Sequence, residues 1–262
     1  MQTSHLPALY RSADSLSNRS QKTFLALLAV HLIVLIFAAA LSVMGNSTFY
    51  TALAQLIALA IALGCSIFLA TSRPDRYWYA GRAVAESVKT ITWRYVSKAE
   101  PFNGADAIAD AEFRNSIKMI VDQNKDISQR LTTHLTETQI TDAMRNMRSE
   151  PLEKRRSTYA RDRIADQLQW YAKKAGFNKR RANLLFGLLI AVNAVAVLSG
   201  VIRFNFLDTP YWPTDVFVAV AASLLSWMQA RRFSELAASY ALAAHEIGLI
   251  KERAHLPETS DM

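Results

Sequence analysis

The chain has 262 residues, of which 51% are apolar and 20% are charged, and its formal net charge is +8 at pH 7. This length suits one or two compact units. The one cysteine, Cys65, lies in an apolar segment, which excludes an intrachain disulfide and a cysteine-rich metal site. An excess of positive charge is compatible with nucleic-acid binding, but its distribution along the chain favours a different explanation.

Two uncharged apolar segments near the N-terminus predict a membrane hairpin. We expect the first span at 23–44 and the second at 49–71, because each is long enough to cross about 30 Å of hydrocarbon. The turn between them is too short to hold a domain. Residues 1–22 do not form a secretory signal, since the apolar segment after them is too long for the core of a signal.

A polar helix is predicted at 75–98, directly after this hairpin. On one side of it, charged and large aromatic side chains follow each other at steps of three or four residues. They are Trp78, Arg82, Glu86, Lys89 and Trp93. A second polar helix, predicted at 151–181, carries a similar set, which includes Arg163, Asp166, Gln167 and Trp170. We expect the two helices to pack against each other.

Two interpretations of these side chains remain open. A tryptophan at helical spacing is usually part of a core, and Arg82 with Glu86 would then be an ordinary exposed ion pair. The alternative is a groove that binds a partner or a ligand, because arginine and tryptophan together can hold a base and a phosphate. Nothing in the spacing requires a ligand.

A helical connector is expected between the two polar helices, at 105–148. Apolar residues at helical spacing begin it, and a polar, threonine-rich stretch follows. We expect the second polar helix to continue into a third span at 184–202, with Gly176 as the position for a kink. A fourth span at 216–230 completes a second hairpin, and a C-terminal helix follows at 231–253.

The distribution of Lys and Arg predicts the orientation. Residues 72–181 hold 22 of the 30 basic residues, whereas the loop after the third span holds 1 and the turn after the first span holds none. Loops rich in Lys and Arg stay on the cytoplasmic side, so we expect both termini and the middle of the chain in the cytoplasm. The middle also holds 14 acidic residues, and direct nucleic-acid binding is therefore the weaker interpretation.

Small and polar side chains within the spans define faces that could pack helices or line a pore. On the second span they are Gln55, Ala58, Ala62 and Cys65. His31 lies in the first span and Asn193 in the third. Such residues are standard packing surfaces between membrane helices, although a pore lining remains open. Packing is favoured because His31 is the only ionisable side chain in the middle of any span.

Motifs for catalysis are absent from the sequence. It has no glycine-rich phosphate loop and no His-Glu-x-x-His, and its five histidines are scattered. We therefore expect neither an enzyme nor a cofactor or metal site. The predicted architecture is all-α: an integral membrane protein with four transmembrane helices in two hairpins and a cytoplasmic helical bundle.

Short motifs around both hairpins resemble the SLATT family, the SMODS- and SLOG-associating two-transmembrane effectors. Those similar to the family's segment after the hairpin are Asp75-Arg76-Tyr77-Trp78-Tyr79, Arg82, Glu86, Lys89, Trp93-Arg94-Tyr95 and Pro101-Phe102. Those similar to the helix before the hairpin and the last helix of another branch are Tyr159, Arg161-Asp162-Arg163, Asp166-Gln167, Trp170-Tyr171, Lys174-Ala175, Asn178, Tyr240, Ala243-Ala244 and Glu246. The resemblance implies two tandem units, at 1–104 and 149–255, joined by the connector.

The resemblance implies a bacterial effector of the inner membrane in a nucleotide-signalled anti-phage or conflict system. Members of the family are proposed to form pores or to disrupt the membrane when a partner senses infection. The implied partners are the lipid bilayer, further copies of the chain, and a nucleotide second messenger or a nucleotide-sensing protein. A membrane-anchored scaffold that recruits a cytoplasmic partner without forming a pore is the alternative.

Overall fold

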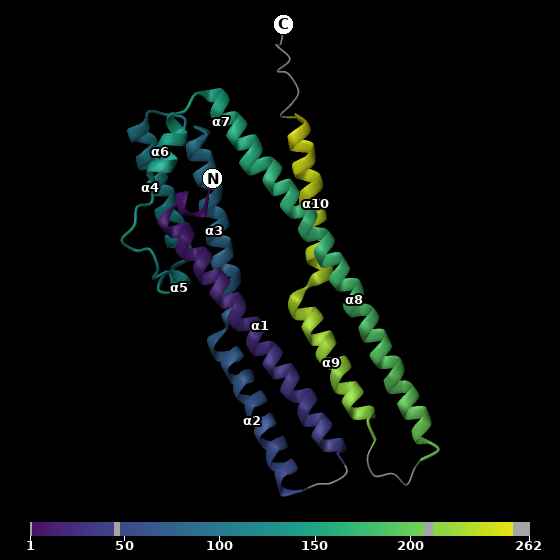
Figure 1. Cartoon of the computed structure of the whole chain (residues 1–262). Coiled ribbons are helices and arrows are strands. Elements are labelled where there is room, and N and C mark those ends of the chain that lie inside the picture. The colour runs from purple at the N-terminus through teal and green to yellow at the C-terminus, as the bar shows by residue number, and fades with distance from the viewer. Residues whose placement is uncertain (1, 45–47, 207–211, 254–262) are drawn as a thin grey trace. The chain divides into compact units, whose positions relative to one another are not determined.

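The computed structural model describes residues 2–44, 48–206 and 212–253, and within them every regular element is a helix. The chain divides into two compact units (Figure 1). Unit 1 comprises Met1–Thr23, Arg73–Gln169 and Ile247–Met262, and unit 2 comprises Phe24–Ser72 and Trp170–Glu246. The prediction of an all-α chain is confirmed over the described residues.

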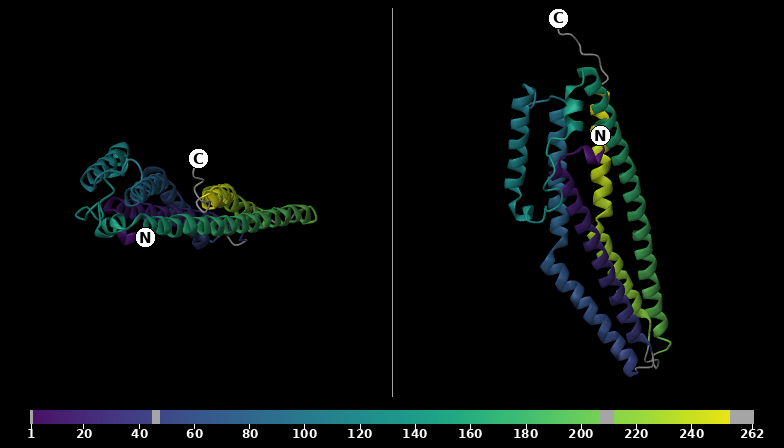
Figure 2. Two further views of the ribbon diagram at one scale, coloured as in Figure 1. Left: turned by 90° about the horizontal axis from the view of Figure 1, so that it is seen from above. Right: turned by 60° about the vertical axis from the view of Figure 1, so that its left-hand side comes forward.

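Unit 1 is a set of helices around one core. Its elements are η1 (Thr3–His5), the first part of α1 (Ala8–Val43), α3 (Pro74–Val96), α4 (Asp106–Gln123), α5 (Lys125–Ser128), α6 (Asp142–Ser149), α7 (Leu152–Tyr159) and the π-helix η2 (Ala160–Ala165). In Figures 1 and 2, α4 lies alongside α3. The predicted polar helix at 75–98 corresponds to α3.

α3 lines the core of unit 1 because its apolar residues recur at helical spacing. Val84 and Val88 are almost completely buried and are one turn apart. The rings of Tyr95, Phe102 and Phe113 pack together, with centroid distances of 4.9 to 6.0 Å. Each aromatic contact of this kind adds about 0.5–1.5 kcal/mol to the burial of apolar area. The loop after α3 and the middle of α4 are thereby fixed against α3.

The first part of α1 crosses α3 closely at Gly81. A Cβ atom added to Gly81 would lie 3.0 Å from the carbonyl oxygen of Ala13 and 3.1 Å from the backbone nitrogen of Ser17. At the same crossing, the Ser17 hydroxyl donates a hydrogen bond of 3.0 Å to the carbonyl oxygen of Trp78. A side chain at position 81 would therefore push the two helix backbones apart.

Replacing Gly81 with alanine is expected to destabilise the chain by about 1–3 kcal/mol, because the added methyl group meets backbone atoms of α1. Thermal melting of the purified chain in neutral detergent measures the effect. Gly176→Ala is the matched control, because no atom lies within 4 Å of the Cβ atom added there. Alanine favours helices, so the control should melt no lower than the wild type. Equal melting of the two variants would contradict the close crossing.

Unit 2 contains the apolar helices. They are the second part of α1, α2 (Phe49–Ser72), most of α8 (Asp166–Arg203), α9 (Thr214–Arg231) and most of α10 (Phe233–Arg253). Three helical stretches of the described chain are long and apolar enough to cross a membrane: Ala8–Val43, Phe49–Val96 and Leu152–Arg203. The fourth predicted span lies in α9, which is not one of these three.

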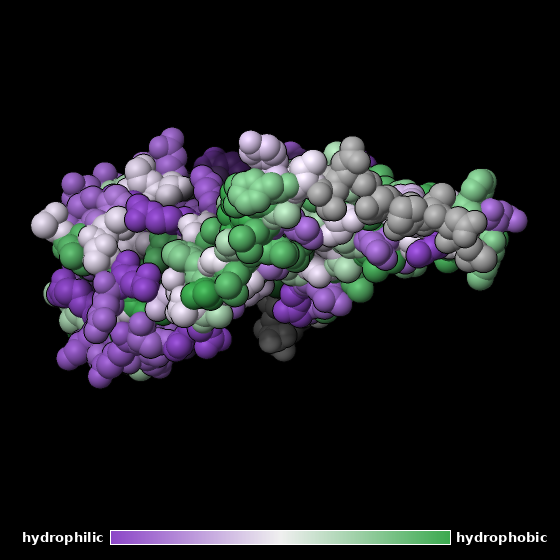
Figure 3. All heavy atoms as spheres, turned by 90° about the horizontal axis from the view of Figure 1, so that it is seen from below, coloured by the Kyte–Doolittle hydropathy of each residue, from purple (hydrophilic) through white to green (hydrophobic). Residues whose placement is uncertain are grey.

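These stretches expose most of their apolar side chains. Phe37, Leu63 and Leu198, for example, are each more than half exposed. In Figure 3 the visible face of the α1–α2 hairpin is largely hydrophobic, whereas the side chains over α4 and α5 are largely hydrophilic. An extended apolar surface of this kind is stable in lipid or against another apolar surface, and not in water.

The threonine-rich stretch forms little helix. After α4, its only helix is α5, although Ile127 and Leu131 are both buried in the core of unit 1. Gly176, the position predicted for a kink, lies inside α8. The long helix contains a π-helical turn at Ala160–Ala165. Such turns insert an extra residue and often lie at functional sites.

Two arginines in the left-handed region of backbone conformation interrupt the helices. Arg73, with a φ of 42°, separates α2 from α3, and Arg232, with a φ of 49°, separates α9 from α10. A residue with a Cβ atom pays about 1–2 kcal/mol for this conformation. In each hairpin the second apolar helix therefore ends at a defined break, whereas α1 and α8 run on without one.

Candidate functional site

The charged and aromatic residues predicted along one side of α3, which we call the stripe, are partly buried and partly exposed. The guanidinium group of Arg82 forms an ion pair of 2.7 Å with Glu86 and lies 3.8 Å from Asp14 on α1. Trp93 is buried, whereas Trp78 is half-buried and stacks on Tyr79 at a centroid distance of 4.7 Å. Trp93 is therefore part of the core, as the packing interpretation expects, while Arg82 and Glu86 form a partly exposed ion pair.

The two predicted polar helices meet at Trp93. The ring of Tyr159, the last residue of α7, lies edge-on to the ring of Trp93 at 5.6 Å. α3 and α7 run in opposite directions in Figure 1. One turn back along α3 from Trp93 is Lys89, and one turn forward from Tyr159 is Arg163, so these two side chains lie across the same contact.

Lys89 lies in a partly buried, charged environment at this contact. Loss of water on burial lowers the pKa of its ammonium group, and the nearby cations of Arg163 and Arg82 lower it further. The carboxylates of Glu86 and Asp166 act in the opposite direction but do not outweigh burial. Half-buried Arg163 and exposed Asp166 thus join the stripe of α3, and half-buried Gln167 follows on the same helix.

Trp170, the last residue of the predicted partner face, belongs to unit 2. Its ring lies 5.5 Å from that of Tyr240 on α10 and 5.0 Å from that of Tyr171. The ammonium group of Lys174 lies over the same ring, 5.7 Å from its centroid. This aromatic cluster joins α8 to α10. Its residues belong to the family-like motifs before the second hairpin and in the last helix.

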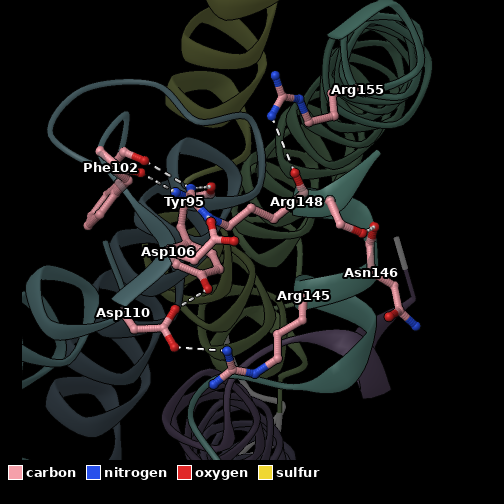
Figure 4. Close-up of polar contacts among 10 residues, drawn as sticks. Tyr95, Phe102, Asp106, Asp110, Arg145, Asn146, Arg148 and Arg155 are labelled. Atoms are coloured by element: carbon pink, nitrogen blue, oxygen red, sulfur yellow. Dashed lines mark hydrogen bonds and ion pairs between the residues drawn. The ribbon is translucent and has the colours of Figure 1, made fainter. Parts of the chain in front are cut away.

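Arg148 anchors the connector in unit 1, and the sequence analysis did not identify it. Its side chain is 2% exposed, and Figure 4 shows it pointing toward the end of α3 and the loop that follows. Its guanidinium group donates to the carbonyl oxygens of Tyr95 at 2.7 Å, Phe102 at 2.9 Å and Gly104 at 3.0 Å. It also forms an ion pair of 2.8 Å with Asp106. One side chain thus connects α6, α3 and the start of α4.

A second polar contact supports the same anchor. The Tyr95 hydroxyl donates a hydrogen bond to Asp110, and Arg145 forms an ion pair of 2.8 Å with the other oxygen of that carboxylate (Figure 4). Burial first, and then the bond to Asp110, raise the pKa of Tyr95 to about 12. The phenol therefore keeps its proton, and remains a donor, throughout the physiological range of pH.

A cavity of about 340 Å³ lies beside this anchor, between η1, α6 and the helix that begins at Leu152. It is lined by His5, Ala143, Asn146, Met147, Glu150, Lys154, Arg155, Thr158 and Asp162. Arg155 donates from Nη1 to the carbonyl oxygen of Arg148 at 3.3 Å (Figure 4), and its Nε atom is buried without a partner. Lys154 pairs with Glu150 at 2.8 Å. The volume lies near the lower end of the range for small-molecule pockets.

In the first hairpin, the candidate face of α2 packs on α1. Ala58 and Ala62 are each 4% exposed. A ring nitrogen of His31 lies 3.1 Å from the carbonyl oxygen of Ala62, and the amide of Gln55 donates a hydrogen bond of 2.6 Å to the hydroxyl of Ser42. These residues therefore join the two helices of one hairpin.

Asn193 is placed differently from the other candidate membrane residues. It is exposed on α8, and its amide donates to the carbonyl oxygen of Leu189 in the same helix at 2.8 Å. Exposed aliphatic side chains surround it in sequence, among them Ile190 and Val197. A polar amide on an apolar helix face is costly in lipid unless a second helix hydrogen-bonds to it.

The described ranges contain no group of three or more His, Cys, Asp or Glu side chains that could hold a metal ion. Several charged groups of unit 1, among them Arg82 and Arg148, are joined to carboxylates or to backbone carbonyls. These contacts hold the helices of unit 1 together and can pass a displacement from one helix to the next.

Two family models together match nearly the whole chain. The description of the first is SMODS and SLOG-associating 2TM effector domain 3, and it matches residues 7–156. The second is SMODS and SLOG-associating 2TM effector domain 1, and it matches residues 159–261. No curated protein and no solved structure matches the chain.

The two matches meet at residues 157–158, within α7, so each includes one of the two hairpins. This agrees with the motifs found around each hairpin in the sequence. Together with three helical stretches of membrane-spanning length and composition, it indicates a membrane-associated effector. The chain belongs to the SLATT family and carries two of its effector domains in tandem.

Proposed function

We propose that the chain is a bacterial inner-membrane effector that assembles from several copies and perturbs the membrane, as a pore, when its cytoplasmic helices are triggered. The trigger is a nucleotide second messenger or a nucleotide-sensing protein of an anti-phage or conflict system. In this proposal the chain has four spans, both termini and unit 1 lie in the cytoplasm, and no catalysis is involved.

The observation that carries the proposal is the continuity of α1. Its first residues, including Leu9 and Ala13, are buried in the core of unit 1, and the same helix continues through the apolar segment to Val43. A continuous helix transmits displacement along its axis better than a flexible linker does. This continuity supports a mechanism in which a change in unit 1 alters the membrane segment.

Assembly from several copies is supported by the exposed apolar surface and by Asn193. One four-span chain has few polar side chains to line a conducting path, and the face that carries Ala58 and Ala62 is used inside its own hairpin. Symmetric copies would repeat a sparse polar side chain as a ring. Asn193, which is exposed on α8, is the side chain we propose for contact with a second copy.

The alternative function is a membrane-anchored scaffold. The half-buried and exposed polar residues Trp78, Arg82 and Glu86 favour it, because they leave part of α3 available to a cytoplasmic partner. In that case the chain would recruit a protein without changing the permeability of the membrane.

Induced expression in bacteria loaded with a membrane-potential dye separates the two functions. We expect the wild type to depolarise the cells when its trigger is present. Asn193→Leu should lose the effect and also the cross-linked oligomer, whereas Leu188→Ala, on the same helix, is the control that should keep both. Cells that keep their potential while the chain is inserted and oligomeric would support the scaffold and contradict the pore.

The proposed topology predicts which positions react from outside the cell. In a Cys65→Ala background, a cysteine at Thr48 should be labelled by a membrane-impermeant thiol reagent in intact cells. A cysteine at Asn115, which is exposed on α4, should be labelled only after lysis. Both should react once the protein is purified, which controls for burial. Labelling of position 115 in intact cells would contradict a cytoplasmic unit 1.

A further inference from the structure

Two basic side chains of unit 1 are near enough for their charges to interact, and neither forms an ion pair with a described residue. Lys89 on α3 and Arg163 in η2 lie across the contact between Trp93 and Tyr159. Neither forms a hydrogen bond or an ion pair within 4 Å with the described residues, and the Nη1 atom of Arg163 is buried. Two like charges that are partly shielded from water destabilise a protein unless an anion lies between them.

Glu86 and Asp166 favour the charged form of Lys89, but no carboxylate forms an ion pair with Lys89 or Arg163 among the described residues. Glu86 is held by Arg82 at 2.7 Å, and Asp14 lies 3.8 Å from the same guanidinium group and accepts a hydrogen bond from Asn18. Asp166 lies one turn beyond Arg163 and is exposed. The acids are thus used by Arg82 or turned to solvent, while Lys89 and Arg163 keep unused donors.

We propose that Lys89 and Arg163 together bind the phosphate group of a soluble anionic ligand. An ammonium group and a guanidinium group can both bind the oxygens of one phosphate, and such bonds are charge-assisted. The low pKa of Lys89 agrees with this site, since an anion would restore the charged form. Because Arg163 lies in the π-helical turn, occupation of the site would draw α3 and η2 together.

The length of α3 between Pro74 and Lys89 is sufficient for the site to lie beyond the lipid headgroups. Lys89 lies 15 residues after Pro74, which is about 22 Å of helix. The polar layer of a bilayer is about 5–8 Å thick on each side. This comparison rests on the proposed span at 49–71. The pair of cations depends neither on that span nor on pore formation.

Binding of inorganic pyrophosphate to the full chain in neutral detergent tests the site, with ionic strength held constant by sodium chloride. Pyrophosphate should raise the melting temperature of the wild type. Lys89→Met and Arg163→Gln should each weaken the apparent affinity about ten- to a hundredfold. The matched controls Lys118→Met and Arg114→Gln, both exposed on α4, should bind as the wild type does.

The ligand-free variants provide a second, independent readout. Lys89→Met should melt no lower than the wild type, because it removes a shielded charge that faces another cation. A clearly lower melting temperature would show that Lys89 is already neutralised inside the chain, and would overturn the proposal. Equal binding by all four variants, or none by the wild type, would overturn it too.

A final arm distinguishes the source of the phosphate. The chain is placed in nanodiscs of phosphatidylglycerol or of phosphatidylcholine and melted without pyrophosphate. Equal melting in both lipids, with pyrophosphate still stabilising, supports the soluble ligand. Stabilisation by phosphatidylglycerol that depends on Lys89 and Arg163, without any effect of pyrophosphate, would assign the site to lipid and contradict the proposal. None of these outcomes depends on whether the chain depolarises cells.

Discussion

Replacing Arg148 with methionine is expected to lower the free energy of unfolding by about 2–5 kcal/mol, because buried carbonyl oxygens lose their donor. Methionine fills a similar volume but cannot donate hydrogen bonds, so the carbonyl oxygens of Phe102 and Gly104 would be left without a partner. The carbonyl oxygen of Tyr95 would keep the bond from the backbone nitrogen of Lys98. Each unsatisfied buried acceptor costs about 1–3 kcal/mol. Asp106 would lose its ion pair as well.

Denaturant unfolding of the full chain in neutral detergent, followed by tryptophan fluorescence, measures this effect. Arg148→Lys should recover only part of the stability, because an ammonium group cannot span acceptors that the planar guanidinium group reaches together. Arg114→Met is the control, since this side chain is exposed and should change stability by less than about 0.5 kcal/mol. Similar midpoints for Arg148→Met and Arg114→Met would mean that the anchor contributes nothing to the fold.

The double substitution Ala58→Leu with Ala62→Leu is expected to separate the helices of the first hairpin, at about 1–3 kcal/mol per site. Both residues are 4% exposed, and small side chains let membrane helices approach closely. Larger side chains there would also break the contact between His31 and the carbonyl oxygen of Ala62.

Protease resistance and thermal melting in detergent report on this packing. Leu56→Ala with Leu63→Ala is the matched control, because these residues are exposed on the same helix and their loss should leave the hairpin intact. If the leucine variant melts as the wild type does, α1 does not cover this face of α2. A face left free in that way would again be available to line a pore.

Most helices could be predicted from the sequence because hydrophobic spacing and uncharged length are local properties. Val84 and Val88 mark the buried side of α3, and the apolar segments of α1, α2 and α8 are long enough to be recognised by composition. The packing of the two polar helices against each other was also expected, but the contact between Trp93 and Tyr159 uses a residue outside the predicted second set. The left-handed Arg73 could not be predicted, because nothing in its side chain favours that conformation.

The anchor at Arg148 could not be predicted for a different reason. Three of its four acceptors are backbone carbonyls, which every residue has and which therefore leave no trace in the sequence. Its helix, α6, is short and mostly polar, and the apolar residue that it buries in the core is Met144. The one available signal was Asp106 at the start of α4, and an acid in the first turn of a helix is common without any partner.

The left-handed arginines give each tandem domain two kinds of mechanical element. One helix of each hairpin, α1 or α8, is an unbroken strut, and the other arm is jointed at Arg73 or Arg232. A hinge of one or two residues can absorb rotation, while a continuous helix transmits both rotation and displacement along its axis. Force that begins at the polar ends of the helices would therefore reach the apolar segments through the struts alone, and the jointed arms would be free to follow.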